Sequence, residues 1–196
     1  MDAESAEPNM NPPAGLASED SVLQLAQSGD RLAFRQLVEQ HQARVFGVAL
    51  RLVGRRADAE ELAQDAFVQL HGSLARIESP AHLTHWLLRT VAHRSIDRLR
   101  QQARQGRQLP LEALGESPQA EAPESAHDPV AAAELHRFLL QLQPDARAVM
   151  ILRYQEDLDP TDIAAVLDMP LPTVKSHLRR SLEWLRTQCA GETHGP

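Results

Sequence analysis

Apolar residues recur at intervals of three and four along most of the chain, which is the spacing of one buried helix face. In the first half, this pattern predicts four helices, at about residues 20–29, 31–54, 58–74 and 82–105. Asp30 is expected to cap the second helix, and Gly54 is expected to end it. Asp58, with Glu61 three residues later, has the form of a capping box for the third helix.

The second half repeats the helical pattern between prolines. One helix is predicted from Asp128-Pro129 to just before Pro144, and another passes through residues 148–152. The stretch from Asp159 to Arg186 predicts two helices joined by a tight turn. Asp159 is a suitable N-cap, and Met169-Pro170 ends the first of the two, because a residue before proline is pushed away from helical geometry. The sequence therefore predicts an all-α fold.

The last predicted helix separates an apolar stripe from a cationic face. Its stripe follows helical spacing and consists of Val174, Leu178, Leu182 and Leu185. Lys175 and Arg179 lie roughly opposite, with Arg180 on the flank. A short helix, a turn and a second helix with an outward cationic half is the helix-turn-helix pattern, whose second helix enters the DNA major groove. The alternative is a two-helix corner with a solvated basic face.

Composition narrows the class of protein. One cysteine, Cys189, excludes an internal disulfide framework and a multi-cysteine zinc site. No apolar run approaches the roughly 20 residues that span a bilayer, and the acidic N-terminus lacks a signal-peptide pattern, so we expect a cytoplasmic protein. His82 and His85 have metal-ligand spacing, but no third ligand is indicated, so no metal or cofactor is expected. No phosphate loop or catalytic set is recognisable, which predicts that the chain is not an enzyme.

The formal net charge of −7 is unevenly distributed. Residues 1–19 form an acidic tail without Lys or Arg, predicted to be disordered. Six arginines follow Trp86 between residues 89 and 107, opposed within that stretch only by Asp97, which favours a nucleic-acid surface, although Trp86 can equally belong to the core. Residues 108–128 are acidic and rich in proline, as a flexible linker would be. This linker separates two predicted helical domains, at residues 20–107 and 129–190.

Three blocks of the sequence carry a resemblance to a known family. They are DAEELAQDAFVQLHGSL at 58–74, HWLLRTVAHRSIDRLR at 85–100, and LQPDARAVMILRYQEDLDPTDIAAVLDMPLPTVKSHLRRSLEWLR at 142–186. The first domain resembles region 2 of bacterial sigma-70-type factors and the second resembles region 4. No further domain is recognisable between them, and this layout resembles that of the extracytoplasmic-function (ECF, group IV) class.

The resemblance implies a promoter-specificity subunit of RNA polymerase with three surfaces. The −35 element would be read by the recognition helix at Thr173, Lys175, Ser176, His177, Arg179 and Arg180. The −10 element would be captured and melted by His82, Trp86, Arg89, His93, Arg94, Arg98 and Arg100. Core polymerase would dock, through its β′ coiled coil, on Asp58, Glu61, Gln64, Asp65 and Gln69. The β flap and an anti-sigma factor are the other partners that the resemblance implies.

Two positions depart from the family pattern. His93 stands where many ECF factors have an asparagine that contacts a −10 base, and Leu171-Pro172 gives the recognition helix no side-chain N-cap. The first bears on −10 preference, and the second on the stability or entry angle of the helix, by about 1 kcal/mol. The alternative function is a stand-alone helix-turn-helix regulator, in which residues 20–107 regulate or dimerise.

Overall fold

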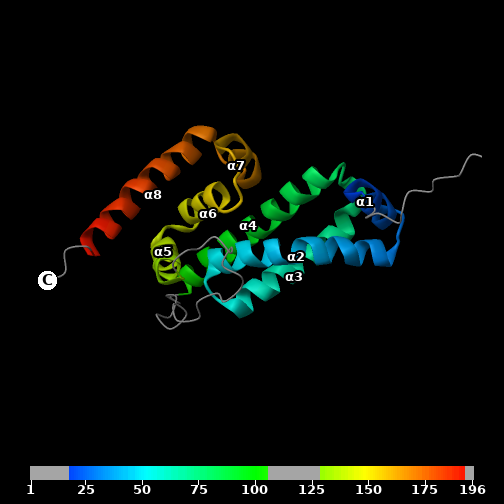
Figure 1. Cartoon of the computed structure of the whole chain (residues 1–196), viewed down its shortest axis with the longest axis horizontal. Coiled ribbons are helices and arrows are strands. Elements are labelled where there is room, and N and C mark those ends of the chain that lie inside the picture. Colours follow the sequence, from blue (N-terminus) through cyan, green and yellow to red (C-terminus); the bar gives the residue numbers. More distant parts are fainter. Residues whose placement is uncertain (1–17, 106–128, 193–196) are drawn as a thin grey trace, which may run out of the picture.

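The computed structural model describes residues 18–105 and 129–192, and over these residues the chain is helical with no strand, which confirms the predicted all-α class. Figure 1 shows the order of the helices along the chain. They are α1 (Glu19–Gln27), α2 (Arg31–Val53), α3 (Arg56–Ser73), a 3-10 turn η1 (Leu74–Arg76), α4 (Pro80–Arg104), α5 (Pro129–Gln141), α6 (Pro144–Tyr154), α7 (Pro160–Leu167) and α8 (Leu171–Glu192).

The first half packs around α2, which contacts α1, α3 and α4. Residues on the predicted apolar face of α2, such as Leu37, Val45 and Val48, are fully buried. Facing them are buried side chains of α3 and α4, including Leu70 and Leu87. The result is a bundle in which α3 and α4 lie against each other and leave their outer faces for other contacts.

The second half folds α5, α6 and α7 around the long helix α8. Leu185 of α8 is buried with Phe138 and Met150, while Val174, near the start of α8, is fully buried against α7. The rings of Phe138 and Trp184 meet edge to face, with centroids 6.2 Å apart. The apolar stripe predicted for α8 therefore packs inward, and its cationic face is left at the surface.

The two halves are not separate in space. The helix α4 contacts α2 and α3 on one side and α6 and α7 on the other, and Figure 1 shows it between them. Val149 and Ile151 of α6 belong to the same apolar cluster as Val53 and Leu99 of the first half. Burial of shared apolar surface holds the halves together.

Several caps follow the predicted chemistry. The carboxylate of Asp30 accepts hydrogen bonds from the backbone N–H groups of Leu32 and Ala33, and Gly54 ends α2 with φ of +74°. Asp159 caps α7 in the same way. Its pKa is lowered because the N–H groups of Asp162 and Thr161 donate to its carboxylate. The stabilisation by this cap is therefore present at neutral pH and is lost only as the pH falls through the lowered pKa.

Three expected helix starts are corrected. Asp58 caps nothing, because α3 begins at Arg56 without a side-chain cap. The helix α4 begins at Pro80, two residues early, since the hydroxyl of Ser79 accepts from the N–H of His82. Glu19, assigned to the tail, is the first residue of α1.

The end of α7 also differs from the prediction. Asp168 takes a left-handed conformation with φ of +52°, so α7 ends at Leu167, two residues before Met169. Residues 1–17 of the tail, the linker at 108–128 with Asp128, Arg107, and the side chain of Cys189 lie outside the described residues.

Replacing the Asp30 cap tests the first half. Asp30→Ala is expected to lower the free energy of unfolding by about 1 kcal/mol, because two N–H groups at the start of α2 lose their acceptor. Asp30→Asn is the control and keeps most of the stability, since its amide oxygen can accept the same bonds. Chemical denaturation followed by circular dichroism measures both; equal losses in the two variants would contradict a capping role.

Candidate nucleic-acid interface

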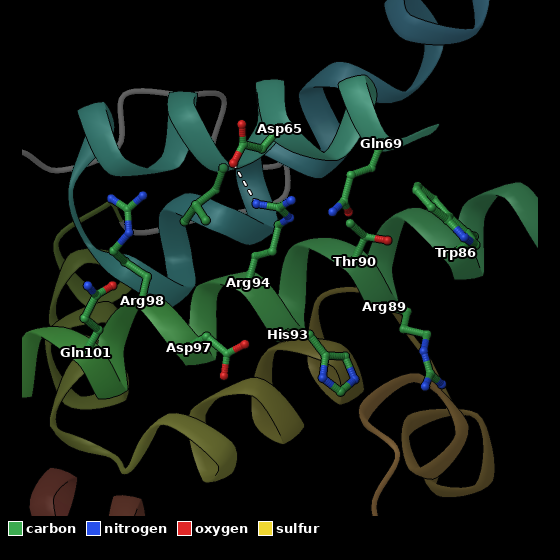
Figure 2. Close-up of a pocket in the computed structure, with 11 residues that line it drawn as sticks. Asp65, Gln69, Trp86, Arg89, Thr90, His93, Arg94, Asp97, Arg98 and Gln101 are labelled. Carbon is green, nitrogen blue, oxygen red and sulfur yellow. Dashed lines mark hydrogen bonds and ion pairs between the residues drawn. The ribbon is translucent and has the colours of Figure 1, made fainter. Parts of the chain in front are cut away.

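A hollow of about 660 Å³ runs along the outer face of α4 where it meets α3. Figure 2 shows the side chains around it. They are Leu62, Asp65 and Gln69 from α3, and Trp86, Arg89, Thr90, His93, Arg94, Asp97, Arg98 and Gln101 from α4. Five residues predicted for the −10 surface thus line one hollow, together with two predicted for polymerase docking.

The sequence prediction missed three lining residues of α4, namely Thr90, Asp97 and Gln101. Their signal was available in the spacing. Trp86, Thr90, Arg94, Asp97 and Gln101 follow intervals of four, four, three and four, which places them on one face of a helix. Thr90 and Gln101 offer neutral hydrogen-bonding groups between the charged ones, so the hollow is not purely cationic.

Two of the predicted DNA-binding arginines are paired with acids of α3. Arg94 lies 2.7 Å from the carboxylate of Asp65, the ion pair marked by a dashed line in Figure 2. Arg98 bridges Asp58 at 2.9 Å and Glu61 at 2.7 Å. The hydrogen bond from Arg98 lowers the pKa of Glu61, and the same hydrogen bond raises the pKa of Arg98.

Asp97 is the only acid within residues 89–107, but acids outside that stretch also oppose these arginines. The acids that oppose them lie more than 25 positions away in sequence. Residues assigned to two separate surfaces, for polymerase and for DNA, meet at a single seam between α3 and α4. Since the Glu61 and Asp65 carboxylates are about half exposed, phosphate groups can compete for the arginines at a modest cost in free energy.

Trp86 lies both at the edge of the core and at the surface of the hollow, so the two positions that the sequence left open for it do not exclude each other. It is half-buried, packs against the apolar cluster of the first half, and lines one end of the hollow. His82 instead contributes to the start of α4, where its Nδ1 accepts a hydrogen bond from the N–H of Glu78. Its position is thus fixed by the turn before the helix.

The remaining predicted −10 residues contact the second half of the chain. Arg89 donates to the carbonyl of Ala165, and His93 Nε2 lies 3.0 Å from the carbonyl of Val166. Both carbonyls are in the last turn of α7, toward which Arg89 and His93 point in Figure 2. Arg100 contacts both carboxylate oxygens of Asp145 at 2.8 Å.

The predicted recognition residues lie together on the first turns of α8. Thr173, Lys175, Arg179 and Arg180 are exposed, while Ser176 and His177 are half-buried. Arg179 forms a 3.2 Å ion pair with Glu183 on the same helix, with both side chains more than half exposed. The residue before α8 is Pro170, which offers no side-chain acceptor, although its carbonyl accepts the N–H of Thr173.

The five predicted docking residues do not form one face. Asp58, Glu61, Asp65 and Gln69 lie on the α4 side of α3, in the seam or the hollow. Gln64 lies on the α2 side, in a second hollow of about 440 Å³ whose lining includes Phe46 and Phe67. Val68, which the prediction passed over, follows the lining residue Phe67 in sequence and is 66% exposed. An apolar floor with a polar rim is typical of protein docking surfaces.

Comparison with protein families follows the same division of the chain. The model of sigma-70 region 2 matches residues 37–105, and that of sigma-70 region 4 matches residues 132–185. The chain belongs to the sigma-70 family. The region 2 match in the first half argues against the alternative of a stand-alone helix-turn-helix regulator.

Relatives place this sigma factor in the ECF class. It is 32% identical to the ECF RNA polymerase sigma factor SigE of Mycolicibacterium smegmatis, over 96% of this chain and 72% of the relative. It is 34% identical to the RNA polymerase sigma-E factor of Streptomyces coelicolor, over 82% of this chain and 88% of that one. The family's function, promoter-directed initiation of transcription, follows for this chain.

Solved structures share the fold. The sigma factor RpoE from Bartonella quintana, solved in complex with the anti-sigma factor NepR, superposes with a TM-score of 0.61 at 20% identity, over 79% of this chain and 94% of that one. CnrH, solved in complex with the cytosolic domain of CnrY, gives a TM-score of 0.61 at 23% identity, over 87% and 96%. Within the described residues of this sigma factor, no helix has the length and apolarity to cross a membrane.

The seam between α3 and α4 predicts unequal effects of two similar substitutions. Asp58→Asn is expected to lower the free energy of unfolding by about 1–2 kcal/mol, because Asp58 is only 14% exposed and accepts from both Arg98 and Gln102. Glu61→Gln, at an exposed position, should cost clearly less. Equal costs, measured by denaturant titration, would contradict the burial of the Asp58 pair.

Proposed function

We propose that this sigma factor contacts its promoter at two points. The outer face of α8 would read the −35 element, and the hollow along α4 would hold unpaired bases of the −10 element. The observation that carries the proposal is the hollow itself, in which an aromatic ring and several cations line one helix face. Aromatic rings stack on bases and cations track the phosphates of single strands, so this combination suits an unwound strand.

The −35 contact is proposed for Thr173, Lys175, Ser176, His177, Arg179 and Arg180. Lys175 and Arg179 project from the exposed face of α8, opposite its buried stripe. Long donors at the start of a recognition helix reach guanine edges or phosphates in the major groove. Pro170 in front of α8 offers only its backbone carbonyl to the N–H groups of Thr173 and Val174, and this start would influence how the helix enters the groove.

The −10 contact is proposed for His82, Trp86, Arg89, His93, Arg94, Arg98 and Arg100, with Thr90 and Gln101 added from the structure. Trp86 would stack on a base at one end of the hollow. His93, in place of the asparagine common in ECF factors, would offer a single ring nitrogen to a base edge, where an amide offers both a donor and an acceptor. The −10 preference of this protein would differ accordingly.

Core polymerase is proposed to dock on α3. The hollow lined by Gln64 and Phe67 would hold apolar side chains of the β′ coiled coil, the exposed Val68 would add apolar surface, and Glu60 would supply charge. A role at core polymerase places the protein in the cytoplasm and requires binding without catalysis of its own. An anti-sigma factor is a further proposed partner, by analogy with the RpoE structure.

Transcript mapping tests the proposal most broadly. Core polymerase reconstituted with this protein on genomic DNA is expected to start transcripts at sites that share one −35 and one −10 sequence. Sequencing of the 5′ ends returns both elements. Start sites indistinguishable from those of core polymerase alone would contradict the proposed function.

Substitutions on α8 test the −35 assignment. Lys175→Ala and Arg179→Ala are each expected to reduce transcription from a mapped promoter about tenfold, as loss of a direct base or phosphate contact does. Arg186→Ala is the matched control, because Arg186 is exposed on the same helix but lies near its far end. Equal run-off transcription from all three variants would contradict the assignment.

A further inference from the structure

A buried arginine fastens the second half of the chain to the end of α2. Arg147 of α6 is 3% exposed, and it donates to the carbonyls of Leu139, Leu140 and Leu142 at the end of α5. It also donates to the carbonyl of Leu52 in the last turn of α2. Burial lowers the pKa of Arg147 to about 10, so the guanidinium stays charged at neutral pH. One cation thus holds the negative ends of two helices together.

Two neighbours complete this contact. The ring of His136 lies beside the backbone of Arg51, and Leu140 packs on Gly54. A β-carbon at Gly54 would lie 3.0 Å from Leu140 Cδ2. Glycine is therefore needed at this position both for the close approach of Leu140 and for the positive φ. Leu140 is buried, yet it belongs to neither apolar cluster, so its burial depends on the first half.

An ion pair about two turns earlier on α2 reinforces the contact. The Nε of Arg44 lies 2.5 Å from the carboxylate of Glu156, which follows α6, and the side chain of Glu156 is 5% exposed. A carboxylate at this depth is costly without a partner. If the halves separate, water replaces Arg44 around Glu156. Loss of the arginine charge therefore favours separation.

The closed arrangement covers part of the proposed −10 surface. Arg89 and His93 form hydrogen bonds with the carbonyls of Ala165 and Val166 in α7. Arg100 pairs with Asp145 of α6. Carbonyl and carboxylate oxygens thereby stand where DNA phosphates or bases would be bound. Arg89 and Arg100 remain about half exposed, so these contacts are weak enough to exchange for DNA once the halves part.

We propose that the free protein inhibits itself: α6 and α7, held on α2 by Arg147 and the Arg44–Glu156 pair, mask Arg89, His93 and Arg100 from single-stranded −10 DNA until the two halves separate. The masking rests on the proposed function, whereas the closure of the two halves does not. Since DNA can bind only the open fraction, its apparent affinity for the free chain is reduced by that fraction.

Charge reversal at the ion pair is the main test. Arg44→Glu sets like charges together and opens the chain, and Glu156→Arg in the same protein restores an opposite pair. Arg35→Glu is the matched control, because Arg35 is on the same helix, is 75% exposed, and among the described residues pairs only with Glu39 of that helix. Leu140→Ala is a second opening variant that leaves both apolar clusters intact.

Two measurements are made on the full chain. Pulsed electron paramagnetic resonance between spin labels at Arg31 and Arg186, in a Cys189→Ser background, gives the distance between α2 and α8. Binding of a fluorescent single-stranded oligonucleotide, with the −10 sequence from transcript mapping, gives the affinity. We expect Arg44→Glu and Leu140→Ala to broaden the distances and to bind the oligonucleotide about tenfold more tightly, as expected when a closed fraction of about 90% opens. The charge swap should return both values toward those of the wild type.

The proposal would be overturned if Arg44→Glu and Leu140→Ala both gave the same spin-label distances and the same oligonucleotide affinity as the control Arg35→Glu. Opening without tighter binding would overturn the masking and leave the closure. Failure of the proposed function looks different: reconstituted polymerase would give no promoter-directed transcripts with the wild-type protein or any variant, while the distances still changed.

Discussion

The structure depends on how the positive charges of α4 are neutralised by the helices around it. One helix carries five arginines in the described residues, and no single neighbour can neutralise all of them. The acids of α3 pair with Arg94 and Arg98 on one side. On the other side, Arg89 and Arg100 donate hydrogen bonds to oxygen atoms of α7 and α6. The charge of one helix thus adds to the buried apolar surface that holds both neighbours against it.

These contacts differ in how easily they are exchanged. The pair between Arg98 and Asp58 is largely buried and holds α3 against α4 as part of the fold. The contacts of Arg89 and Arg100 are about half exposed, and each can be replaced by phosphate or water at small cost. A helix built in this way keeps its own bundle intact while its outer cations change partners. Such a division suits a protein that exists both free and bound to a promoter.

Much of the fold could be predicted because its signals are local. Proline, the caps at Asp30 and Asp159, and the apolar periodicity act within one or two helical turns, and the structure confirms them. The seam between α3 and α4 could not be predicted, since Arg98 meets Asp58 across 40 positions and no local pattern pairs them. The capping role expected of Asp58 was wrong, because α3 begins two residues earlier at Arg56 and the carboxylate of Asp58 pairs with Arg98. The closure of the two halves also depends on contacts distant in sequence, such as Arg147 with Leu52.

The central claim is that α4 and α8 bind different promoter elements at the same time. A photo-crosslinking amino acid at Thr90, inside the hollow, or at Lys175, on the recognition helix, tests it directly in the complex of core polymerase, this protein and a mapped promoter. The account predicts crosslinks from position 90 to the non-template strand of the −10 element and from position 175 to the −35 element. Crosslinks from both positions to one element, or from neither to promoter DNA, would contradict it.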